Sequence, residues 1–128
     1  MSVYPALRED VACDVVILGG GISGAFLAQR LVREGLEIVV LDKRDVCGGR
    51  TRASTALLQY EIDTPLVDLS GRIGRQNAVR AYRLCHDSIL AIEALVAELA
   101  IDCGFQRRKS VYLASRASDA PSLQEECA

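Results

Sequence analysis

A run of glycines between two short apolar segments constrains the fold of this chain more than any other feature. Residues 14–18 (DVVIL) are apolar enough to form a buried parallel strand. The glycine-rich residues 19–24 (GGGISG) follow, and they open a helical pattern that reaches Glu34. A second apolar segment, residues 37–41 (EIVVL), ends at Asp42. Strand, glycines, helix, strand and acidic residue in this order predict a βαβ unit with a parallel sheet.

The glycine spacing indicates a dinucleotide-binding site, because each glycine has a mechanical role there. Gly19 permits a tight turn, Gly21 lets a pyrophosphate approach the backbone, and Gly24 lets the helix pack closely on the strand. The phosphates would lie on unpaired N–H groups at the positive end of the helix dipole. Asp42 is placed to accept hydrogen bonds from a ribose diol. The alternative is a glycine-rich turn of another α/β protein, with Asp42 capping a loop.

Length and composition narrow the class of protein further. The 128 residues suit one small domain, and a net charge of −2 gives no reason to expect nucleic acid or an anionic membrane as partner. Five widely spaced cysteines and a single histidine, His86, favour reduced thiols and no metal site. No apolar stretch reaches the roughly 18 residues of a membrane span. We therefore expect a cytoplasmic protein without a targeting signal.

The middle of the chain is predicted to be mostly helical. Residues 51–69 lack a clean period, and Pro65 interrupts any helix there, so a loop or one helical turn is expected. Residues 71–100 follow a helical pattern, either as two helices broken near His86 or as one long bent helix. The apolar face of residues 89–99 and the open edge of the second strand lack evident partners. We therefore expect marginal stability or oligomer formation.

The last quarter predicts two short strands and a final helix. Residues 105–107 and 110–114 have the pattern of a β-hairpin, and residues 118–121 open a helix with Pro121 in its first turn. Two parallel strands are few for a stable doubly wound sheet. We therefore expect residues 1–128 to be the amino-terminal portion of a longer protein, or a truncated gene product.

A second glycine pair after Asp42 favours one dinucleotide over another. Gly48 and Gly49 permit close approach of the backbone to a phosphate, and Arg50 could pair with the diphosphate charge. Thr51 and Ser54 supply short polar side chains. A second binding loop suits an elongated cofactor such as FAD better than NAD.

Two basic residues after the second strand leave NADP to be considered. Lys43 and Arg44 would suit its 2′-phosphate, but a carboxylate at Asp42 would repel that group. Cys47 lies near the expected cofactor, although no neighbouring group is arranged to activate its thiol.

These segments resemble the D-amino-acid oxidase and glycine oxidase superfamily of FAD-dependent oxidoreductases. The resemblance rests on residues 14–24, 41–44 and 48–54, and residues 55–66 are similar to a bacterial subgroup. Residues 82–85 and 111–115 extend it, so that it covers about residues 12 to 126. It implies a Rossmann-like FAD-binding domain with parallel strands, an added helical segment and a short hairpin.

The resemblance also implies where FAD would bind. The adenosine would lie on the glycine motif and Asp42, the diphosphate and ribityl chain along Arg50 to Ser54, and the flavin ring near residues 55–59. The implied cofactor-binding residues are Gly19, Gly20, Gly21, Ile22, Ser23, Gly24, Asp42, Lys43, Arg44, Gly49, Arg50, Thr51, Ala53, Ser54 and Leu58.

The function that the resemblance implies is oxidation of a C–N bond of an amine or amino acid by hydride transfer to the flavin. The substrate domain of that family is not expected in this chain, so the chain alone is not expected to be a complete catalyst, and catalytic residues stay unassigned. The alternatives are a truncated, non-catalytic nucleotide-binding module and a fragment of an NAD-linked dehydrogenase.

Overall fold

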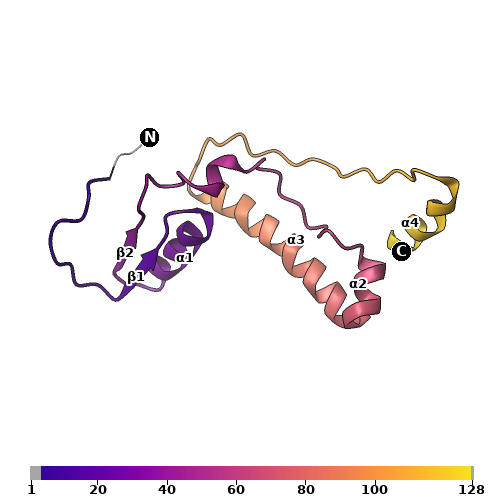
Figure 1. Ribbon diagram of the computed structural model, residues 1–128, viewed down its shortest axis with the longest axis horizontal. Helices are drawn as coiled ribbons and strands as arrows, with labels where there is room; N and C mark the ends of the chain where they lie inside the picture. Colours follow the sequence, from indigo (N-terminus) through magenta and orange to yellow (C-terminus); the bar gives the residue numbers. More distant parts are fainter. Residues whose placement is uncertain (1–3, 128) are drawn as a thin grey trace. The chain divides into compact units, whose positions relative to one another are not determined.

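The computed structural model describes residues 4–127 and divides the chain into two compact units, with the boundary in the sequence between Leu57 and Leu58. The first unit contains strand β1 (Val15–Leu18), helix α1 (Ile22–Arg33) and strand β2 (Ile38–Leu41), as Figure 1 shows. The second contains the helices α2 (Leu66–Ile73), α3 (Arg75–Glu98) and α4 (Ala120–Glu126). Short 3₁₀ turns cover Arg50–Ala53 (η1) and Ala117–Asp119 (η2).

The first unit confirms the predicted βαβ arrangement. β1 and β2 pair in parallel, with Val15 opposite Ile38 and Leu18 opposite Leu41. The pairing is extended at one end, where the Asp14 carboxylate accepts the Glu37 backbone N–H at 2.8 Å. At the other end the Gly19 N–H donates to the Leu41 carbonyl at 2.7 Å. The glycine loop is therefore fixed directly to the end of β2.

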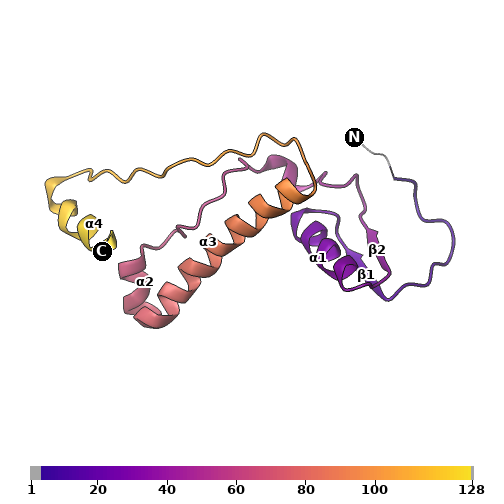
Figure 2. The same cartoon turned by 180° about the vertical axis from the view of Figure 1, so that it is seen from behind.

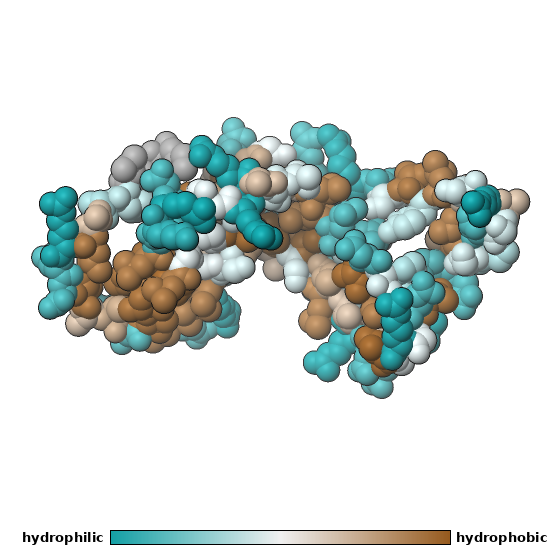
Figure 3. Space-filling view, in the orientation of Figure 1, coloured by the Kyte–Doolittle hydropathy of each residue, from teal (hydrophilic) through white to brown (hydrophobic). Residues whose placement is uncertain are grey.

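One face of β1 is buried and the other is open, as the alternation of side chains along a strand requires. Ile17 is 6% exposed and lies beneath α1, with its Cγ2 3.4 Å from the position that a Cβ on Gly24 would take. Val16 and Leu18 point away from that face and are 52% and 81% exposed. Apolar residues accordingly gather on the surface of the part that contains β1 and α1 (Figure 3).

The second unit has a continuous helix at His86, where the sequence allowed either a break or one long helix. α3 runs without interruption through this residue, and the chain bends at Gly74, between α2 and α3 (Figure 2). Gly74 adopts φ +82°, a conformation that other residues rarely take. The bend lets α2 pack against α3, where Ala78 is completely buried.

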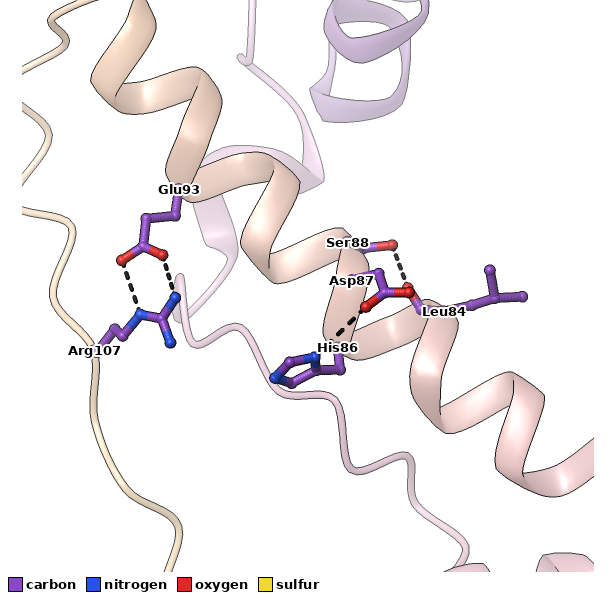
Figure 4. A network of polar contacts seen from close by, with 6 residues as sticks. All are labelled: Leu84, His86, Asp87, Ser88, Glu93 and Arg107. Atoms are coloured by element: carbon purple, nitrogen blue, oxygen red, sulfur yellow. Dashed lines mark hydrogen bonds and ion pairs between the residues drawn. The ribbon is translucent and has the colours of Figure 1, made fainter.

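The predicted β-hairpin is wrong. Residues 104–115 form no strand in the structure, and Val111 and Leu113 are 77% and 82% exposed. An alternating pattern produces a strand only where another strand supplies the backbone hydrogen bonds, and the described chain offers none here. The segment is held to α3 by the Arg107 guanidinium, which donates two hydrogen bonds to the Glu93 carboxylate (Figure 4).

Helix α4 confirms the predicted last helix and supplies a cap to α2. The residue before α2 is Pro65, whose side chain cannot accept a hydrogen bond. The Glu126 carboxylate takes that role: it accepts the N–H groups of Leu66 at 2.6 Å and Val67 at 2.9 Å. A carboxylate at a helix N-terminus is also favoured by the helix dipole. One side chain therefore joins two segments 60 residues apart.

Replacing Glu126 should loosen this unit. We expect Glu126→Ala to lower the free energy of unfolding by about 1 kcal/mol, the usual cost of losing a helix cap. Glu125→Ala is the matched control, because Glu125 is the exposed neighbour in the same helix. Denaturant titration followed by circular dichroism measures both variants, and equal losses of stability would contradict the capping role.

Tyr82 makes the stability of the second unit depend on pH in the alkaline range. Its hydroxyl donates to the Thr64 carbonyl at 2.8 Å, and burial, followed by the charge of Glu126, raises the pKa of Tyr82 to about 12. An unfolded tyrosine ionises near pH 10. The neutral phenol therefore contributes stability that is complete below about pH 10 and is lost as the pH rises through about 12.

We expect Tyr82→Phe to be less stable at neutral pH, by about 1 kcal/mol for the lost hydrogen bond. It should also lose less stability than the native chain between pH 10 and pH 12. Unfolding midpoints in denaturant across this range give the comparison, with Tyr4→Phe, a change at an exposed residue, as the control. An identical alkaline decline in the Tyr82 variant would exclude this residue as the cause.

Candidate functional site

The glycine loop, residues 19–24, turns at Gly19 and is held by a hydrogen bond to the Gly20 carbonyl. Gly19 adopts φ +115°, which only glycine accommodates readily, and this turn leads from β1 into α1. Gly20, the next residue, is buried, and its carbonyl accepts the Cys47 N–H at 2.9 Å. The loop that follows β2 is therefore fixed to the glycine loop through the backbone.

Asp42 lies beside the same loop, as the sequence predicted. One carboxylate oxygen accepts the Gly20 N–H at 2.8 Å, and the other accepts the Arg44 N–H at 2.9 Å. These bonds, from Arg44 first and Gly20 second, hold the pKa of the Asp42 carboxyl below its ordinary value. The carboxylate is thus ionised at neutral pH, and a ribose diol can donate to it while a 2′-phosphate is repelled.

The N-terminus of α1 is capped from a distant part of the chain. Gly21 precedes the helix and has no side chain to cap it, and the first turn has no acidic residue. The Ile22 N–H donates instead to the hydroxyl of Thr51, in η1, at 3.1 Å. The two loops that the sequence assigned to one cofactor are thereby brought together in the structure.

Gly24 brings α1 close to the glycine loop. A Cβ added at this position would lie 1.9 Å from the Gly19 carbonyl oxygen, far inside van der Waals contact. Gly49 has a similar role on a smaller scale, since its missing Cβ leaves room for the Arg44 guanidinium, whose Nη2 lies 2.9 Å from that position. Both glycines are explained by close packing.

The remaining predicted cofactor-binding residues are characterised by their exposure and their local contacts. Ser23, Lys43 and Arg50 are exposed. The Ser54 hydroxyl accepts the N–H of Ala56 at 3.1 Å and so belongs to its own turn. Leu58 is the first residue of the second unit. Ala53 ends η1.

Sequence reasoning missed the contribution of the backbone after β2. The N–H groups of Arg44 and Cys47 hold Asp42 and Gly20 in place, and Cys47 adopts φ +59° to do so. Any residue carries an N–H group, so no residue type marked these positions. The signal that was available is the position of Cys47 immediately before a glycine pair, which is typical of a tight turn.

The single histidine, His86, lies in the second unit. The ring of His86 meets the ring of Tyr60 edge-on, with centroids 5.6 Å apart. A hollow of about 470 Å³ runs along exposed residues of α3, and it is lined by Arg75, Gln76, Val79, Arg80, Arg83, Leu84 and Asp87. None of these residues belongs to the predicted cofactor site.

Comparison with known proteins establishes the family. The family model described as FAD dependent oxidoreductase matches residues 14–128, nearly the whole chain. The chain therefore belongs to the FAD-dependent oxidoreductase family, and FAD rather than NAD is its cofactor. This match confirms the predicted cofactor and the family that the sequence was found to resemble.

Individual relatives are much longer than this chain. A Bacillus subtilis protein named as a Rieske 2Fe-2S iron-sulfur protein is 34% identical over 100 residues, which are 78% of this chain and 20% of that protein. Flavin-containing amine oxidase B of Cavia porcellus is 59% identical over 39 residues, 30% of this chain and 8% of its own. The flavin-containing amine oxidase of Danio rerio is 38% identical over 90 residues, 62% of this chain and 16% of its own. The chain thus spans a fifth or less of these relatives.

Two further observations complete the comparison. No solved structure matches the chain significantly. Within residues 4–127, none of the helices combines the length and the apolar character needed to cross a membrane.

The close approach at Gly24 predicts a severe effect of a single methyl group. Gly24→Ala must displace either α1 or the Gly19 carbonyl, so we expect it to lower the unfolding temperature and to abolish FAD binding. Gly71→Ala is the matched control, because a Cβ at Gly71 meets nothing within 4 Å and alanine is favoured in a helix by about 1 kcal/mol. Thermal melts and FAD titration of both variants test this, and a Gly24 variant that binds FAD normally would refute it.

Proposed function

We propose that this chain is the FAD-binding part of a flavoenzyme that oxidises a C–N bond of an amine or amino acid. The observation that carries the proposal is the hydrogen bond from Gly20 N–H to the Asp42 carboxylate at 2.8 Å. It joins the two elements that recognise an adenosine diphosphate: a glycine loop at a helix N-terminus and an ionised acid at the end of the next strand. The matches to flavin-containing amine oxidases support the substrate class.

The residues of the first unit fit the cofactor by their chemistry. The N-terminus of α1, the positive end of the helix dipole, suits the diphosphate, and the ionised Asp42 suits the ribose hydroxyls. The guanidinium of Arg50, two residues after Gly48, would add charge to the diphosphate end. Lys43 and Arg44 would flank the adenine.

The chemistry itself belongs to the cofactor. Oxidation of a C–N bond removes two electrons from the substrate, and bound FAD would supply their acceptor. The residues described above would bind and orient the cofactor. No residue of this chain is assigned to bind the substrate or to accept a proton from it. A small-molecule amine or amino acid is the proposed partner of the whole protein.

The test is a cofactor titration of the purified 128-residue chain. We expect the desalted protein to retain flavin absorbance, or to bind added FAD with quenching of flavin fluorescence, and released cofactor to have the mass of FAD. Asp42→Asn should weaken FAD binding roughly tenfold or more, because a charged acceptor is replaced by a neutral amide. Asp45→Asn, a change at an exposed acid in the same loop, should leave the affinity within about twofold.

Two results would count against the proposal. A folded chain that binds no FAD by titration would remove the cofactor assignment for this polypeptide. Equal affinities of the Asp42 and Asp45 variants would remove the role of Asp42.

A further inference from the structure

The N-terminus of α1, where the proposed diphosphate would bind, has a hydrogen-bond acceptor in the hydroxyl of Thr51. The first N–H groups of a helix have no partner within the helix and are satisfied by caps, water or ligands. In α1 the Ile22 N–H is satisfied by Thr51, 29 residues further along the chain, at 3.1 Å. This is the end of the helix at which the proposed diphosphate would bind.

The same N–H cannot serve both oxygens at full strength. An amide has one hydrogen, and a second acceptor has to share or replace the first. A phosphate oxygen is the stronger acceptor, because a hydrogen bond to a charged group is shorter and about twice as strong as one between neutral groups. A bound diphosphate is therefore expected to take the N–H from the hydroxyl.

We propose that Thr51 is a positioning residue that changes its hydrogen-bond partner when the cofactor binds. In the free chain its oxygen accepts the Ile22 N–H; in the bound chain its O–H donates to the diphosphate, which has taken that N–H. The proposal rests on the proposed function, since it assumes that the diphosphate lies at α1.

The local geometry permits this exchange. A Cβ at Gly21 would lie 3.2 Å from the Thr51 oxygen, so the glycine at this position leaves the hydroxyl room to turn. Thr51 belongs to the short turn η1 (Arg50–Ala53), whose Arg52 and Ser54 N–H groups donate to the Gly49 and Thr51 carbonyls at 3.3 Å. A change at Thr51 is thus passed to the loop of residues 48–54. The exchange would couple occupancy of the site to the position of this loop.

The first experiment follows the Ile22 amide by NMR in the native 128-residue chain. Adenosine and ADP are matched probes, because they differ only in the diphosphate. We expect ADP to shift the Ile22 resonance and to slow exchange in residues 48–54, while adenosine leaves both almost unchanged. An Ile22 resonance that responds equally to adenosine and ADP would overturn the proposal.

The second experiment uses Thr51→Val, which keeps the shape of the side chain and removes the hydroxyl, with Thr51→Ser as the control. In the free Val variant the Ile22 amide should exchange at least threefold faster, and ADP should restore its protection. Affinity for ADP should fall roughly three- to tenfold in the Val variant and stay near native in the Ser variant, because a charge-assisted bond is lost on binding. Affinity for adenosine should change in neither.

The outcomes separate this proposal from the one on which it rests. A native chain that binds neither ADP nor FAD refutes the proposed function and the role of Thr51 together. A native chain that binds ADP, with a Val variant of equal affinity and equal Ile22 exchange, refutes only the role of Thr51.

Discussion

The hydrogen bond between the Asp42 carboxylate and the Gly20 N–H is the interaction on which the candidate site depends. Parallel pairing places the carboxyl ends of β1 and β2 at the same edge of the sheet, so the glycine loop after one strand meets the acid after the other. The loop of Cys47 and the hydroxyl of Thr51 are then fixed to the glycine loop and to the start of α1. The contact between Gly20 and Asp42 therefore depends on the register of two strands of four residues each.

The charges of the site select the ligand by position. The start of α1 is the positive end of the helix dipole, and the basic residues Arg30 and Arg33 lie in its last turn, where the dipole favours them. Asp42 is negative, and two backbone N–H groups lower its pKa and keep it so. A ligand with a diphosphate near α1 and free ribose hydroxyls near Asp42 matches both charges. A ligand with a phosphate on the ribose matches the charge at α1 but is repelled by Asp42. The charges of the described residues therefore favour FAD over NADP, and the family match independently supports the same cofactor.

The sequence predicted the first unit well because its signals are local. The turn at Gly19, the apolar strands and the position of Asp42 are determined by neighbouring residues and by one short crossover. The errors arose where structure depends on partners far away in the chain. Residues 110–114 have the composition of a strand, but no strand among the described residues pairs with them. Of the two alternatives for residues 71–100, the break near His86 is wrong, because α3 continues through that residue. The cap that Glu126 provides to α2 had no sequence signal, because it joins residues 60 positions apart.

The cofactor is expected to contribute to the stability of the first unit as well as to its chemistry. Ile17 and Ala78 are the buried apolar residues among those described, and only Ile17 belongs to the first unit. So small a core leaves the loops after β1 and β2 dependent on a few hydrogen bonds, each worth about 1 kcal/mol. A ligand that binds only the folded state adds RT ln(1 + [L]/Kd), about 2.7 kcal/mol at a hundredfold excess over Kd. That contribution exceeds any single contact of the site, so binding FAD and ordering the two glycine loops are best regarded as one equilibrium.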